Sequence, residues 1–201
     1  MTRYPSKAWR SYRPTSPRPT SPPGARSSAP VSLAPRDCRV LGLDPGSQRT
    51  GYGVIDCHTS AEQHVASGCV DVTGHDMVIR LQRIFAAISA LVAQHRPDIV
   101  AIERVFVHRN PDSALKLGQA RGVALCAAAS LGASVHEYAP RAIKMAVTGY
   151  GAAAKPQVAQ MVRTLLLLET RLAADAADAL AVALCHAHSR RLGALVAIDV
   201  A

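Results

Sequence analysis

The 201-residue sequence predicts one α/β domain, a five-stranded mixed sheet with helices on both faces, preceded by a basic tail. Two observations predict this class. First, three apolar segments follow one another with only short turns between them, which indicates an antiparallel meander. Second, apolar residues then recur at intervals of three and four, and the resulting helices alternate with further apolar strands, which adds parallel strands through crossover connections.

The meander is expected at residues 38–43, 53–57 and about 64–72. Its first turn contains Pro45 and Gly46, within the segment VLGLDPGSQRTGYGVID. Asp44 ends the first strand in apolar surroundings, where an ionised carboxylate is costly unless a cation or a hydrogen-bond donor meets it. This segment alone leaves two interpretations open: a metal-bound carboxylate, and an acceptor for the turn that follows.

Helices and strands alternate through the rest of the domain. Asn110 is a good N-cap, and Pro111 suits the first helical position, so a helix is expected to begin there. Gly118 and Gly122 share one face of this helix, where either a second subunit or a neighbouring helix would approach closely. The expected elements are a helix at 78–92, a strand at 98–103, a helix from 110 to about 131, a strand at 134–138, and helices at 141–147, 155–168 and 173–190.

The positive charge is concentrated in the tail. Residues 1–36 hold six Arg and one Lys without any acid, so +7 of the formal net charge of +9 lies there. Eight of the thirteen prolines also lie in this segment, which predicts disorder. We interpret it as a dispensable tail; an electrostatic arm for nucleic acid, a targeting leader and an upstream start codon are the alternatives. The folded domain is expected at 37–191, followed by a C-terminal tail at 192–201.

The cysteines and the hydropathy pattern indicate a cytoplasmic location. The five cysteines form no CxxC pair, which favours reduced core thiols over disulfides or a zinc site. We expect no apolar run that approaches the roughly 18 to 20 residues needed to span a bilayer, and therefore no membrane partner.

Four acidic residues lie in apolar surroundings. Asp175 and Asp178 are three residues apart in ADAADALA and so share one helical face, where like charges repel. Asp44 and Glu103 lie at strand ends. Carboxylate oxygens suit Mg²⁺ or Mn²⁺ rather than Zn²⁺, and such clusters typically perform phosphoryl transfer with two ions. A favourable interaction with the helix N-terminus is the competing explanation for the two helical acids.

Four ordered segments resemble the RuvC family of Holliday-junction endonucleases: LGLDPGSQRTGYGVID, DIVAIERVF, NPDSALKLGQARGVA and DAADALAVA. The resemblance implies a ribonuclease-H-like fold, a homodimer, and symmetric nicking of four-way DNA junctions in recombination and repair. It also implies the RuvA–RuvB branch-migration complex as a partner. Two Mg²⁺ ions per subunit, with Mn²⁺ as a substitute, would be held by Asp44, Glu103, Asp175 and Asp178.

Further site residues are expected beside these acids. By resemblance, Phe106 matches an aromatic residue that stacks on a base near the junction point; core packing would also explain it. Lys144 and Lys155 match basic catalytic-site residues that would contact the scissile or a flanking phosphate, with solvated surface lysine as the alternative. The remaining expected phosphate contacts, each of which would also fit an ordinary helix surface, are Arg109, Lys116 and Arg121.

Three rival classes fit part of the pattern. Actin-like ATPases and sugar kinases have phosphate loops similar to GLDPGSQRTGYG, but they need two lobes, and the chain after the tail supplies one. A non-catalytic junction-binding paralogue would be expected to lack one of the acids, and none is missing. Other ribonuclease-H-like nucleases differ in substrate preference. The four acids together favour a metal-dependent endonuclease.

Overall fold

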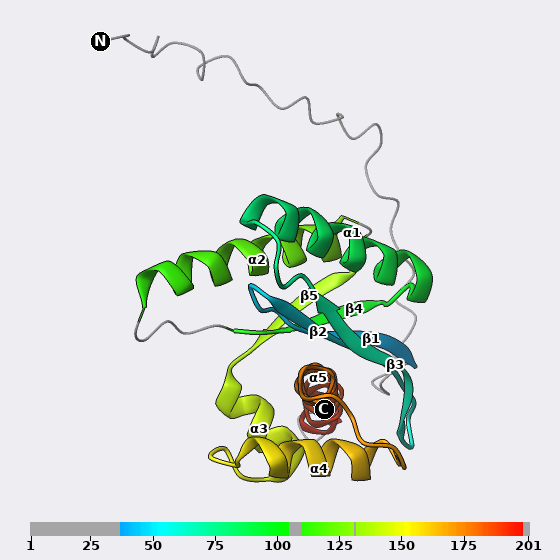
Figure 1. Cartoon of the computed structure of the whole chain (residues 1–201). Helices are drawn as coiled ribbons and strands as arrows, with labels where there is room; N and C mark the ends of the chain where they lie inside the picture. The colour runs from blue at the N-terminus through cyan, green and yellow to red at the C-terminus, as the bar shows by residue number, and fades with distance from the viewer. Residues whose placement is uncertain (1–36, 105–109, 131, 199–201) are drawn as a thin grey trace, which may run out of the picture. The chain divides into compact units, whose positions relative to one another are not determined.

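The computed structural model describes residues 37–104, 110–130 and 132–198, with side chains described up to residue 193 (Figure 1). Strands and helices alternate in the predicted order. Their bounds are β1 (Cys38–Asp44), β2 (Arg49–Cys57), β3 (Glu62–Asp71), α1 (Met77–His95), β4 (Ile99–Glu103), α2 (Pro111–Ala129), β5 (Ser134–Tyr138), α3 (Pro140–Thr148), α4 (Lys155–Leu165) and α5 (Ala174–Ile198).

The strands form one mixed sheet in the order β3-β2-β1-β4-β5. β1, β2 and β3 pair antiparallel, and β4 and β5 run parallel to β1. This confirms the predicted meander and the predicted crossover strands.

Three boundaries differ from those predicted. β2 begins at Arg49 rather than at residue 53, because its pairing with β1 continues to Gly51 opposite Asp44. α4 ends at Leu165, and Leu167 adopts a left-handed backbone conformation that ends the helical path. α5 continues to Ile198, so most of the segment expected as a C-terminal tail is helical.

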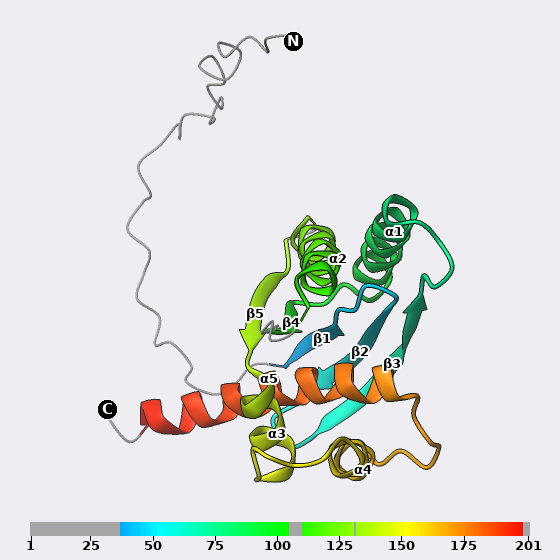
Figure 2. The same ribbon diagram turned by 60° about the vertical axis from the view of Figure 1, so that its left-hand side comes forward.

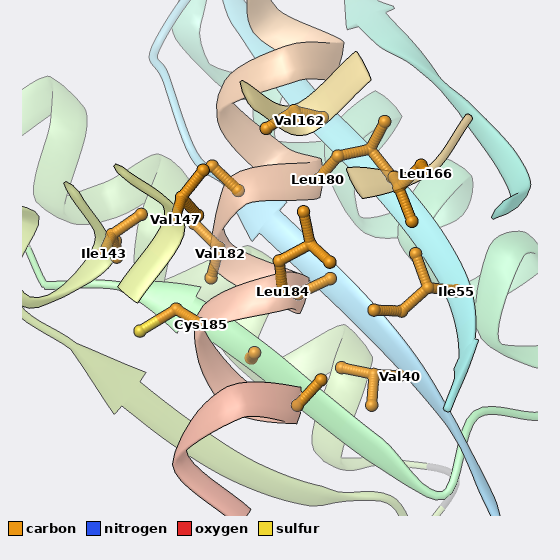
Figure 3. Close-up of a cluster of buried hydrophobic side chains, with 14 of the residues drawn as sticks. Val40, Ile55, Ile143, Val147, Val162, Leu166, Leu180, Val182, Leu184 and Cys185 are labelled. Atoms are coloured by element: carbon orange, nitrogen blue, oxygen red, sulfur yellow. The ribbon is translucent and has the colours of Figure 1, made fainter. Parts of the chain in front are cut away.

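Helices cover the two faces of the sheet unequally (Figures 1 and 2). α1 and α2 lie on one face, and α3, α4 and α5 lie on the other. Neighbouring residues of β1 serve opposite faces, as the alternation of a strand requires: Val40 belongs to the apolar cluster under α5, and Leu41 to the cluster under α1 and α2. Figure 3 shows the first cluster, to which Leu180 and Leu184 of α5 and Ile55 of β2 all belong.

α5 lies unusually close to the sheet. A Cβ atom on Gly42 of β1 would lie 2.1 Å from the carbonyl oxygen of Ala179, and one on Gly51 of β2 would lie 2.0 Å from that of Asp175. Only glycine leaves room for this contact. The glycines therefore place the first two turns of α5, with their two aspartates, directly against the end of β1.

α1 corrects one expectation from the sequence. By length and composition alone this 19-residue helix is apolar enough to cross a membrane, with a mean hydropathy of 1.4. Its buried residues are Ile84, Ile88 and Val92, which recur at intervals of four and face the sheet core. Arg80 and Arg83 interrupt the apolar character. The apolar stripe of α1 is therefore explained by packing onto the sheet.

Candidate active site

The candidate site lies where β1 and β4 end beside α5. These parallel strands pair with Leu43 opposite Ile102, so Asp44 and Glu103, the next residue of each strand, end side by side. Asp178 reaches the same place from the second turn of α5. Asp44, Glu103 and Asp178 line a cavity of about 280 Å³, which we call the acidic cavity. Three of the four predicted acids thus come together from segments far apart in the sequence.

Burial and neighbouring negative charge favour the protonated forms of Asp44 and Glu103. Removal from water raises the pKa of Asp44, and the negative charges of Glu103 and Asp178 raise it further. The pKa of Glu103 is also raised, mainly by burial. A hydrogen bond between the two carboxyl groups raises the pKa of Asp44 and lowers that of Glu103. Of the two, Asp44 is the carboxyl group whose ionised form is the less favoured.

Two lysines border the acidic cavity. Nζ of Lys155 donates to Oδ2 of Asp178 at 2.7 Å, and this hydrogen bond is the main cause of the raised pKa of Lys155. The Lys155 side chain remains 78% exposed, so it can also contact a ligand that enters from solvent. Lys144 of α3 lines the cavity, and its charge lowers the pKa of Glu103. Both lysines lie where a phosphate group would approach the acids.

Asp175 points away from the other three acids. Sγ of Cys69 donates to its Oδ2 at 3.4 Å, and Nη1 of Arg49 lies 3.8 Å from the same oxygen. Among the described residues, no three His, Cys, Asp or Glu side chains are already arranged to hold one metal ion. Arg49 lies closer to Asp71, at 3.1 Å, so its ion pair with Asp175 is the weaker of the two. A four-acid site requires Asp175 to leave Cys69 and Arg49.

The other predicted site residues lie outside the acidic cavity or outside the described residues. Phe106 and Arg109 fall within 105–109, which the structure does not describe. Lys116 pairs with Asp112 one helical turn away, at 2.6 Å on the surface of α2.

Arg121 is expected as a phosphate contact on the surface of its helix. In the structure its side chain is mostly buried. Its Nη2 lies 2.9 Å from Oε1 of Glu137 on β5, and its Nε donates to the carbonyl oxygen of Glu103 at 3.3 Å. Only 18% of the side chain is exposed. Arg121 therefore joins α2 and β5 to the strand end that carries Glu103, and its guanidinium is already paired with an acid within the protein.

Arg49 and Cys69 are the residues that sequence reasoning missed. Both contact Asp175, and no short-range sequence pattern indicates these contacts. Arg49 lies two residues before Gly51, so its place beside the start of α5 depends on the close packing of that helix. Cys69 reaches the site only through the register in which it lies opposite Gly51.

The residues present fit a hard divalent cation. The acidic cavity offers carboxylate oxygens from three chain segments, the ligand type that Mg²⁺ and Mn²⁺ prefer. A cation would relieve the repulsion that raises the pKa of Asp44. The described cavity lining contains no Cys or His that would favour Zn²⁺.

The fold and the site define a nuclease domain of the ribonuclease-H-like class. Residues 40–186 match the family model described as "Crossover junction endodeoxyribonuclease RuvC". The chain belongs to the RuvC family. It is 56% identical over 150 residues to the RuvC of Alkalilimnicola ehrlichii, covering 75% of this chain and 91% of that protein. It is 54% identical over 151 residues to the RuvC of Dichelobacter nodosus, covering 75% and 86%.

Two solved structures resemble the chain over most of its length. The Thermus thermophilus RuvC structure has a TM-score of 0.71 and 35% identity, covering 78% of this chain and 97% of that chain. The structure of the T. thermophilus protein in complex with a Holliday junction substrate has a TM-score of 0.73 and 36% identity, with the same coverage.

Proposed function

We propose that this chain is a structure-selective endonuclease that resolves four-way DNA junctions by symmetric paired nicks. The observation that carries the proposal is the convergence of Asp44, Glu103 and Asp178 on one cavity bordered by Lys144 and Lys155. The support from comparison is that a structurally similar relative has been solved with a Holliday junction substrate. The class of reaction is hydrolysis of a DNA phosphodiester, leaving 5′-phosphate and 3′-hydroxyl ends.

The acids would hold the metal. Asp44, Glu103 and Asp178 would supply the first ligands, and Asp175 would join them after its carboxylate leaves Arg49 and Cys69. We propose Mg²⁺ as the natural ion, two per subunit, with Mn²⁺ as a substitute. When bound, the metal supplies Lewis-acid stabilisation of the phosphoryl oxygens and a more acidic water.

The side chains of the cavity then bind and orient the DNA strand. A bound cation would favour the ionised form of Asp44, against the burial and the neighbouring negative charges that raise its pKa. Lys155 and Lys144 place ammonium groups beside the phosphate, where positive charge stabilises the charge that develops during phosphoryl transfer. The glycines of β1 and β2 keep α5 and Asp178 fixed against Asp44, so the ligands need little rearrangement.

We propose that α2 forms a homodimer. Its buried face consists of alanines, whereas Gly118 and Gly122 lie on the opposite side, where an added Cβ would have no atom within 4 Å. Leu115 on the same side is 69% exposed. A two-fold axis along this face would present the two acidic cavities symmetrically to two strands of a junction. A cytoplasmic location and cooperation with RuvA–RuvB complete the proposal, and both rest on family membership.

Cleavage of a synthetic four-way junction against a linear duplex of the same sequence tests this function. With Mg²⁺ or Mn²⁺ we expect nicks at symmetric positions on two strands of the junction and little cleavage of the duplex. Chelation with EDTA should stop the reaction. Equal cleavage of the duplex, or cleavage that persists in EDTA, would contradict the proposal.

A further inference from the structure

A second cavity adjoins the acidic cavity and has the opposite electrostatic character. It measures about 380 Å³ and lies between α4, the start of α5 and the segment that joins them. Lys155 and Asp178 line both cavities. We call the second one the basic cavity, because Arg163 and Arg171 complete its charged lining. None of the four sequence motifs that indicate the family contains either arginine.

The positions of the cations follow from helix geometry. Lys155, Ala159 and Arg163 are spaced by four residues on α4, so they share one face of the helix. All three line the cavity, and the alanine leaves space between the two cationic side chains. Arg171 lies across from them in the α4–α5 segment, and Ala177 of α5 is another small lining residue. Cationic side chains thus surround a recess with small side chains at its wall.

The positive charge of the basic cavity is largely uncompensated. Asp178 is the only acid among the lining residues, and it already accepts from Lys155. Nη2 of Arg163 donates to the carbonyl oxygen of Glu169 at 3.1 Å, which orders the guanidinium without neutralising it. Arg171 is exposed and makes no hydrogen bond or ion pair with any residue that the structure describes. By contrast, Arg121 is paired with an acid.

We propose that the basic cavity binds a backbone phosphate that flanks the cleaved one on the same DNA strand. The inference rests on the proposed nuclease function. Lys155 lies between the two cavities, so a strand with one phosphate at the acids passes the basic cavity with a neighbouring phosphate. Arginine presents several N–H donors in a planar arrangement that suits phosphate oxygens. Arg171 and Arg163 therefore position the strand and do not take part in the chemical step.

Substitution of Arg171 tests the subsite. Arg171→Gln removes one charge, and Arg83→Gln is the matched control, because Arg83 is exposed on α1, on the opposite face of the sheet. The dissociation constant for a synthetic four-way junction is measured in EDTA at salt concentrations from about 50 to 200 mM. Loss of one phosphate contact should reduce the slope of log affinity against log salt by about 0.9 in Arg171→Gln and leave it unchanged in Arg83→Gln.

Neutral methylphosphonate linkages then locate the contact. One linkage at a time is replaced around the cleaved bond, and binding to wild type and to Arg171→Gln is compared. We expect one flanking position at which the replacement weakens the wild type but not the variant. Identical salt slopes for Arg171→Gln and Arg83→Gln, in a protein that binds and nicks four-way junctions, would overturn the subsite alone. Failure of the wild type to prefer four-way DNA would overturn the proposed function as well.

Discussion

Two alanine-rich helices, α5 and α2, lie on opposite faces of the same sheet and use their small residues differently. α5 packs directly over Gly42 and Gly51, and nearly every residue from Ala176 to Cys185 is buried. α2 is buried through four alanines on one side only. Its own glycines, Gly118 and Gly122, face the other way, with no atom where a side chain would begin.

The contrast separates two uses of small residues. On the α5 side, glycine and alanine are buried in the packing of the helix on the sheet, which fixes the position of Asp178 in the candidate site. On the α2 side, they are left available for contact with another molecule. Composition alone does not distinguish these cases, because both helices are rich in alanine; the position of the buried face does.

The largest effect on folding is expected from Gly42→Ala. The new methyl carbon would lie 2.1 Å from a backbone oxygen of α5, so the helix must move away. Overpacking of this kind should lower the free energy of unfolding by about 3 kcal/mol, measured by chemical denaturation. Gly118→Ala is the control: it meets no atom, and the better helix propensity of alanine should keep or raise stability by about 0.5 to 1 kcal/mol. Equal destabilisation by the two variants would contradict the contrast.

A slightly smaller effect on the free energy of unfolding is expected from protonation of His186, a buried polar residue of α5. Its Nδ1 lies 2.7 Å from the hydroxyl of Tyr138, and burial lowers its pKa to about 4. The unfolded chain, with a His pKa near 6.5, therefore binds the proton first as the pH falls. The contribution of His186 to stability should be full above about pH 6.5 and fall by about 2 kcal/mol between pH 7 and pH 4.5, opposite in sign to that of Asp44, whose pKa is raised.

Thermal or urea unfolding across this pH range measures the effect. His186→Gln removes this titrating group, so the difference in stability between wild type and variant should change by the same amount over this range. A pH dependence that is identical in wild type and in His186→Gln would show that His186 does not behave as a buried neutral imidazole.

The association face of α2 is tested by Leu115→Lys. A charge on this exposed apolar position should raise the dimer dissociation constant at least about tenfold, equivalent to about 1.4 kcal/mol. Sedimentation velocity over a range of concentrations measures it. Leu167→Lys is the matched control, because Leu167 is also exposed, at 88%, but lies just after α4 on the other side of the sheet. If both variants associate like the wild type, α2 is not the dimer helix.

The smallest effect on cleavage is expected from deletion of residues 1–36. This segment carries +7 of the net charge, so its removal should mainly lower nonspecific DNA affinity at low salt. Nicking of four-way junctions should remain. A truncated protein that binds junctions but does not nick them would contradict the interpretation of a dispensable tail.

The sheet was predictable from the sequence because its signals are local. Turn lengths and the change of apolar period indicated the meander, the crossover helices and their order, and the strand-end positions of Asp44 and Glu103 followed. The orientation of Asp175 was not predictable, since it depends on the β2–β3 register that places Cys69 and on charge repulsion. The ion pair of Arg121 with Glu137 was equally hidden, because it joins a helix to a later strand.

The comparison also explains why the site is on the α5 side. Parallel strand ends meet there, and a helix held tightly by glycines brings Asp178 to them. On the face covered by α1 and α2, the described residues form an apolar stripe but no comparable group of acids. In the proposed function, chemistry and association therefore occupy different faces of one small sheet.

The most direct test is the nicking rate of Asp44→Asn on a synthetic four-way junction with Mg²⁺, beside Asp98→Asn. Asp98 is exposed and immediately precedes β4, whereas Glu103 is the last residue of that strand. We expect Asp44→Asn to lose about 10³-fold or more in rate, since a metal ligand contributes several kcal/mol to transition-state stabilisation. Its junction binding in EDTA should be retained, and Asp98→Asn should nick normally. Undiminished nicking by Asp44→Asn would contradict the assignment of the acidic cavity as the active site.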